Sequence, residues 1–210
     1  MAGEESGGSA LTPEESWGTI HTTMDRPRSS MYLAGTTPIL MLWGGITAVA
    51  YLFAYWLETG GSDLVEERPW VIVPLFGVLI VAGIVGSAII GHRAGNRNVS
   101  REVNRAVGLR VFGFWMAVAM AAWFIPAVAG MWNDELGPRI PHVSIGIVSL
   151  GYILYGMMTR PVLAIVGVGI AAAYYLPSFL AGDAALAVSA VATLAVVGEG
   201  TAWLRRIGIR

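Results

Sequence analysis

Six apolar stretches make up most of this chain and limit the folds that it can adopt. A helix needs about 20 apolar residues to cross a bilayer core of roughly 30 Å. Inside a membrane, only helices or closed barrels satisfy the backbone, and these stretches lack the alternation of barrel strands. The sequence therefore predicts an all-α, polytopic membrane helix bundle of six transmembrane helices. Their predicted spans are 32–57, 69–90, 107–132, 143–158, 161–180 and 184–204.

The fourth and fifth stretches are separated only by a short basic turn. Arg160 and Pro161 lie between them, and proline is favoured at the first position of a helix. We therefore expect two helices joined by a tight turn. The expected domain organisation is a disordered tail, a cytoplasmic amphipathic helix with its linker, the six-helix transmembrane domain and a cytoplasmic tail. These segments are predicted at 1–11, 12–30, 31–204 and 205–210.

Arginine is distributed unequally among the loops that join the stretches. Successive loops alternate between the two sides of the membrane, and short loops rich in arginine remain in the cytoplasm. Five arginines fall within 93–110, between the second and third stretches. With six spans, one side receives all of the 13 basic residues except Arg68 and Arg139. The sequence therefore predicts a multi-pass protein of the cell inner membrane, with both termini in the cytoplasm.

The composition argues against several classes of function. The formal net charge of −1 gives no attraction to nucleic acid, and the absence of cysteine excludes disulfides and thiolate metal sites. No ionisable residue lies in the middle of any stretch, and Glu199 is the only acid within one. Such residues mark proton relays and ion pathways inside membranes. We therefore expect neither a pump nor a proton-coupled carrier.

The histidines and the short motifs give no sign of an active site. His21, His92 and His142 are too dispersed to ligate one metal or haem together, although a single histidine could still bind a pigment or haem axially. The chain has no HExxH, GxSxG or P-loop pattern. We therefore expect a protein that is not an enzyme, with no catalytic residue, no cofactor and no metal.

Four arginines recur at every fourth position and would follow one side of a helix. They are Arg93, Arg97, Arg101 and Arg105. One interpretation is that they only set the topology and touch lipid phosphates. The other is a docking surface for anionic lipid head groups or for an acidic partner, such as another membrane-protein subunit.

The segment 12–26 has the pattern of a short amphipathic helix. Thr12 is placed as its N-cap, and Glu15 completes a capping box. Such a helix would lie on the inner membrane surface or dock on the arginines. Its apolar face would carry Trp17, Ile20 and Met24.

Small residues recur along the second stretch and indicate close helix packing. Gly83, Ser87, Gly91 and Gly95 are spaced by four residues, which lets a neighbouring backbone approach. Packing within the chain is the favoured interpretation, and a homodimer is the alternative.

Two stretches resemble small uncharacterised bacterial membrane proteins with six helices. "TTMDRPRSSMYLAGTTPILMLWGGITAVAYL" (22–52) is similar to their opening, and "GYILYGMMTRPVLAIVGVGI" (151–170) to their turn between the fourth and fifth helices. Together the two stretches cover about a quarter of the 210 residues. Proteins of this kind are often encoded beside winged-helix regulators. The resemblance implies a membrane protein and supplies no site residues.

Two functions remain open. The first is a non-enzymatic accessory or regulatory subunit that docks through its cytoplasmic basic face. The second is a small permease or channel for an uncharged or lipid-like solute, which would use a cleft lined by tyrosines. The candidate lining residues are Tyr51, Tyr55, Tyr152, Tyr155, Tyr174 and Tyr175.

Overall fold

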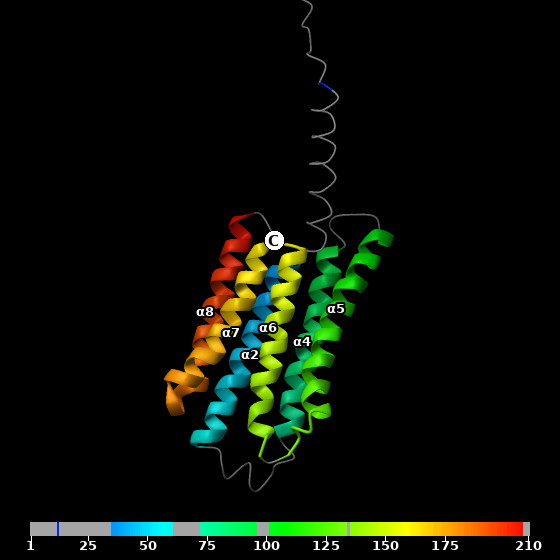
Figure 1. The fold of residues 1–210 in the computed structure, drawn as a ribbon. Coiled ribbons are helices and arrows are strands. Elements are labelled where there is room, and N and C mark those ends of the chain that lie inside the picture. Colours follow the sequence, from blue (N-terminus) through cyan, green and yellow to red (C-terminus); the bar gives the residue numbers. More distant parts are fainter. Residues whose placement is uncertain (1–11, 13–34, 61–71, 96–100, 134, 208–210) are drawn as a thin grey trace, which may run out of the picture.

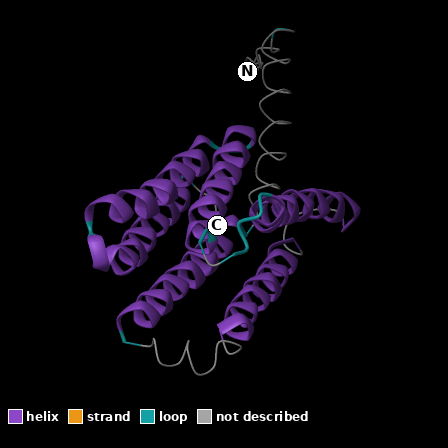
Figure 2. Cartoon of the chain, turned by 60° about the horizontal axis from the view of Figure 1, so that its bottom comes forward, coloured by secondary structure: helices purple, strands orange, loops and turns teal. Residues whose placement is uncertain are grey.

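The computed structural model describes residues 12, 35–60, 72–95, 101–133 and 135–207. Within this part of the chain the structure is helical throughout, with short connections (Figures 1 and 2). The prediction of an all-α six-helix bundle is thereby confirmed. The long helices are α2 (Thr36–Thr59), α4 (Ile72–Gly95), α5 (Arg101–Val128), α6 (Ile140–Met158), α7 (Pro161–Leu180) and α8 (Ala185–Arg206), with 3₁₀ turns η2 (Gly137–Arg139) and η3 (Gly182–Ala184).

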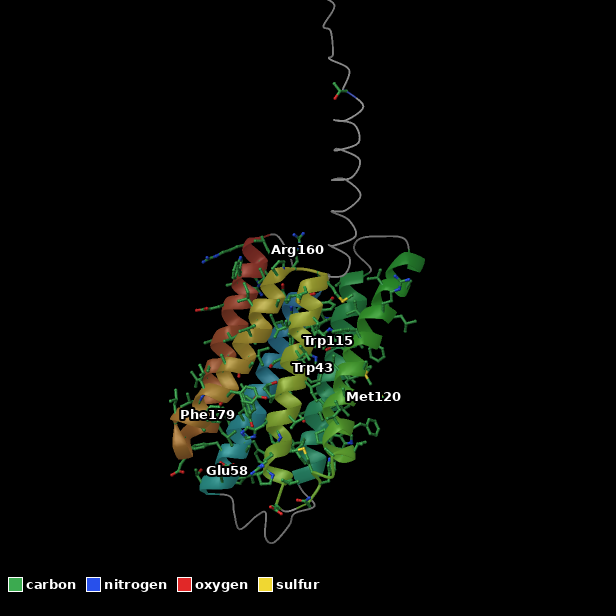
Figure 3. The ribbon with its side chains drawn as sticks, viewed as in Figure 1. Trp43, Glu58, Trp115, Met120, Arg160 and Phe179 are labelled. Carbon is green, nitrogen blue, oxygen red and sulfur yellow. The ribbon has the colours of Figure 1, made fainter. Side chains whose placement is uncertain are left out.

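All six long helices contain a segment that is long and apolar enough to cross a membrane, which makes this a multi-pass membrane protein. Large apolar side chains on their outer surfaces are exposed, as expected for residues that face lipid. Figure 3 shows Met120 and Phe179 at the periphery of the bundle, where they are 52% and 81% exposed.

The helices pack in the order α5–α6–α7–α8–α2–α4, each against the next in the series. Helices α4 and α5 therefore stand at its two ends, although only residues 96–100 separate them in the sequence. In the span of α7, 44% of the residues are buried, against 6% in the spans of α4 and α5. The bundle thus has a central helix and two peripheral ones.

Four helices, α2, α6, α7 and α8, supply the buried core. One cluster is formed by Leu40, Tyr155, Val162, Leu163, Val166, Ile170, Val197 and Leu204. The second cluster is formed by Ala48, Tyr51, Tyr174 and Ala190.

Glycines allow these helices to approach closely. A Cβ atom on Gly167 of α7 would lie 2.8 Å from the backbone oxygen of Ser149 on α6. A Cβ atom on Gly44 of α2 would lie 2.7 Å from the Val197 side chain on α8. Both distances are too short for a carbon atom, so a side chain at either glycine would force its neighbour to shift, and at Gly167 that neighbour is backbone.

The turn between α6 and α7 has the form expected from the sequence. Helix α6 ends at Met158, and the Thr159 hydroxyl donates a hydrogen bond to the Tyr155 carbonyl oxygen at 2.6 Å. Arg160 is extended, and Pro161 begins α7. The prediction of two helices joined by a tight turn is confirmed.

Helix α5 ends earlier than its apolar stretch, which continues to residue 132. Gly130 has φ 68°, a left-handed conformation that glycine adopts easily. The backbone N–H of Gly130 donates to Ala127, and that of Met131 donates to Pro126. These bonds satisfy the last carbonyl oxygens of the helix, so α5 ends at Val128.

Candidate functional site

The two ends of the bundle carry different charges. Helices α2, α5 and α7 begin, and α4, α6 and α8 end, at the same end of the bundle (Figure 1). We call this the basic end, because Arg93, Arg160, Arg205 and Arg206 are exposed there. Figure 3 shows Arg160 at the basic end and Glu58 at the opposite one. We call the opposite end the acidic end, where Glu58, Glu135 and Asp183 are exposed together with Arg139.

The four regularly spaced arginines belong to two helices. Arg93 lies in the last turn of α4, where a cation interacts favourably with the helix dipole. Arg101 and Arg105 belong to the first turns of α5, which begins five residues before its candidate span, Ala106–Val128. Because they are four residues apart, they share one face of α5. Arg97 lies outside the described residues.

The amphipathic segment expected near the N-terminus also lies outside the described residues. This applies to Trp17, Ile20 and Met24, the three apolar residues proposed to dock on the arginines.

The small residues of α4 do not all contact the same helix face. A Cβ atom on Gly83 would lie 2.7 Å from the Trp43 ring of α2, and the Trp43 Nε1–H donates to the Ser87 hydroxyl at 2.9 Å. By contrast, no heavy atom of the described residues lies within 4 Å of a Cβ built on Gly91. Gly95 is the last residue of α4. Packing within the chain therefore involves Gly83 and Ser87, and Trp43 is a partner that the spacing did not identify.

One group of tyrosines lies near the acidic end and is packed together. The rings of Tyr51 on α2 and Tyr174 on α7 stack with centroids 5.5 Å apart, and they are only 7% and 4% exposed. The Tyr174 hydroxyl lies 3.4 Å from Nδ1 of His142 on α6. The Tyr175 hydroxyl donates to the His142 backbone oxygen. Tyr51 and Tyr174 are therefore packed against each other between α2 and α7, whereas Tyr175 is half-buried.

A second group lies between α5 and α6. Tyr152 and Tyr155 both contact Trp115 of α5, with ring centroids 4.6 and 5.7 Å apart. Phe114 completes this aromatic cluster. Five of the six candidate tyrosines thus divide between two separate packing clusters, a division that depends on which helices are neighbours. Tyr55, one turn after Tyr51 on α2, is half-buried.

The described residues contain no group of three or more histidine, aspartate or glutamate side chains placed to hold a metal ion. His92 lies in the last turn of α4 at the basic end, and His142 lies in the first turn of α6 at the acidic end. The two imidazoles are therefore on opposite sides of the bundle.

No protein-family model matches the chain, and no curated protein or solved structure is significantly similar to it. The resemblance to small bacterial membrane proteins therefore rests on the two sequence stretches alone.

Proposed function

We propose that this protein is a non-enzymatic accessory or regulatory subunit of a membrane complex and that it docks through the basic end. In this proposal the membrane is a bacterial inner membrane, and the basic end and both termini are cytoplasmic. The observation that carries the proposal is the start of α5. The helix includes residues 101–105, which precede its candidate span, Ala106–Val128.

A helical extension fixes the spacing of its charges. The orientation of a protein in the membrane depends only on the positive charge of its loops. It does not depend on which face of a helix carries that charge. Arg101 and Arg105 share one face of α5. Exposed arginines of α4, of the turn before α7 and of α8 lie at the same end of the bundle. This arrangement favours recognition of a partner with acidic groups at matching positions.

The chemistry of the partner follows from the charges. An acidic protein segment would meet the arginines with a defined spacing, whereas anionic lipid head groups would contribute about 1 kcal/mol per arginine with little dependence on spacing. We propose an acidic segment of another membrane-protein subunit, because the arginines sit on a helix of fixed geometry.

The experiment separates the effect of the number of arginines on α5 from the effect of their spacing. The double variant Arg101→Gln/Arg105→Gln removes both charges, and the exchange variant Asn104→Arg/Arg105→Asn keeps the net charge but moves one arginine about 100° around the helix. Arg139→Gln removes a charge at the acidic end and serves as the control. Chains that co-purify with each protein in mild detergent are identified and quantified at low and high salt.

We expect the parent and Arg139→Gln to retain the same partner subunit. Both basic-end variants should lose most of it, and high salt should weaken the parent complex. If the exchange variant retains the partner fully, the arginines act only as a lipid anchor. If no membrane-protein chain co-purifies with the parent, the accessory role is wrong.

A further inference from the structure

Four hydroxyl groups inside the bundle make no hydrogen bond to any described residue, although they are almost completely buried. One belongs to Ser149 on α6, where that helix packs closely against Gly167 of α7. The other three belong to Tyr51 on α2 and to Thr193 and Thr201 on α8, whose side chains are 7%, 2% and 5% exposed. A buried hydroxyl without a partner is costly, and three of them would consume a sizeable fraction of the small net stability of a protein. Each of them therefore needs a partner.

The three hydroxyls lie at successive depths of one interface. The close contact between Gly44 on α2 and Val197 on α8 places these two residues at the same depth. Thr193 and Thr201 lie one turn on either side of Val197, on the same face of α8. Tyr51 lies two turns beyond Gly44 towards the acidic end. From Tyr51 to Thr201 the series extends about 16 Å along the bundle at 1.5 Å per residue.

The acidic end gives access to this series. His142 is exposed in the first turn of α6, and its Nδ1 lies 3.4 Å from the Tyr174 hydroxyl. The Tyr174 ring stacks on Tyr51. A series of side-chain contacts therefore runs from the exposed His142 through Tyr174 to the ring that carries the first of the buried hydroxyls.

The surroundings limit what could bind. A hydroxyl both donates and accepts hydrogen bonds, and the buried residues of the described chain include no charged side chain. The ligand is therefore neutral. It is also small, because close contacts such as that between Gly44 and Val197 fill the interface.

We propose that the interface of α2, α7 and α8 binds water, held by the hydroxyls of Tyr51, Thr193 and Thr201 and reached from the acidic end past His142 and Tyr174. This proposal does not depend on the docking function. A threonine can instead turn its hydroxyl to a carbonyl oxygen of the preceding helical turn. The Tyr51 hydroxyl lies at the far end of a rigid ring and cannot reach a carbonyl oxygen of its own helix in this way. Tyr51 is therefore the residue that tests whether water is bound.

The first test is hydroxyl-radical footprinting of the intact protein in detergent, with water as the probe. Radiolysis of bound water produces radicals that oxidise only the side chains in direct contact. Tyr155 is the internal control, because it is a tyrosine as buried as Tyr51, at 6% exposed, and packs in an aromatic cluster. We expect Tyr51 to be oxidised at least severalfold faster than Tyr155.

The second test removes the Tyr51 hydroxyl alone. If water binds there, Tyr51→Phe loses a hydrogen bond and should melt at a lower temperature than the parent, while the control Tyr55→Phe, one turn away on α2, should change little. In a dry interface, Tyr51→Phe removes an unpaired polar group and should melt at the same temperature as the parent or higher. That result, or equal oxidation of Tyr51 and Tyr155, would overturn the proposal.

Discussion

At the scale of single residues, two glycines of α4 that share the same four-residue spacing have different surroundings. Gly83 lies against the Trp43 ring, which the hydrogen bond to Ser87 holds in place. Gly91 has no neighbour among the described residues where a side chain would begin. The spacing predicted a close helix contact, and the contact exists for part of the series. Which members take part could not be predicted, because this depends on Trp43, a residue of another helix.

This difference gives a matched pair of substitutions. Gly83→Ala should lower the free energy of unfolding by about 1–3 kcal/mol, because the added methyl group overlaps a tryptophan that cannot move away. Gly91→Ala should leave it unchanged or raise it by up to about 1 kcal/mol, because alanine is the better helix former. Thermal unfolding in detergent measures both. Equal losses in the two variants would contradict the described contact between α2 and α4.

At the scale of elements, the helix pair α6–α7 depends on direct contact between backbones. A Cβ atom on Gly156 would overlap the backbone of Ala164, and the neighbouring chain cannot rotate aside as a side chain could. Apolar composition predicted both helices, and Arg160 followed by Pro161 predicted their tight turn. It could not predict this contact, since the stretch 143–158 contains several glycines of equal appearance.

The substitution Gly156→Ala tests the helix pair. We expect a loss of about 3 kcal/mol or more in the free energy of unfolding, since one of the two helices must move to make room. Gly198→Ala on α8 is the control, because within the described part of the chain no heavy atom lies within 4 Å of its Cβ position. Thermal unfolding and size-exclusion chromatography would show the difference, and a Gly156→Ala protein as stable as the control would refute the close approach.

The ends of elements were harder to predict than their existence. Met131 and Trp132 are apolar and extend the third stretch in the sequence, but the left-handed Gly130 ends α5 before them. At its other end, α5 begins six residues before the predicted span because the polar residues from Arg101 continue the helix. Hydrophobicity identifies the part of a helix that lies in lipid. It does not identify where the helix begins or ends.

At the scale of the whole molecule, charge separates the two ends of the bundle. The alternation of six spans predicted which helix ends gather together, and the structure places them so. The arginine count predicts which of the two ends is cytoplasmic. The order of neighbours around the bundle could not be predicted, because every long helix is apolar on most of its surface and the sequence does not say which face meets which helix.

Cysteine labelling tests the orientation in the membrane. The chain has no cysteine, so Asp183→Cys at the acidic end and Ile207→Cys at the basic end each introduce a single thiol at an exposed position. In intact cells, a reagent that cannot cross the membrane should label Asp183→Cys, while Ile207→Cys should react only after the cells are opened. The reverse pattern would overturn the orientation and, with it, the proposal of a cytoplasmic docking surface.

The packing of α2 against α8 also has a consequence for the biosynthesis of the protein. Helix α2 is the first of the described spans to be translated, and α8 is the last. During translation, α2 therefore enters the bilayer through its own hydrophobicity before α8 has been synthesised. Until α8 is inserted, Leu40 and Gly44 lack their neighbours on that helix. The core closes only when the final helix arrives, so a ribosome that stops before α8 leaves a chain that is inserted in the membrane but unfinished.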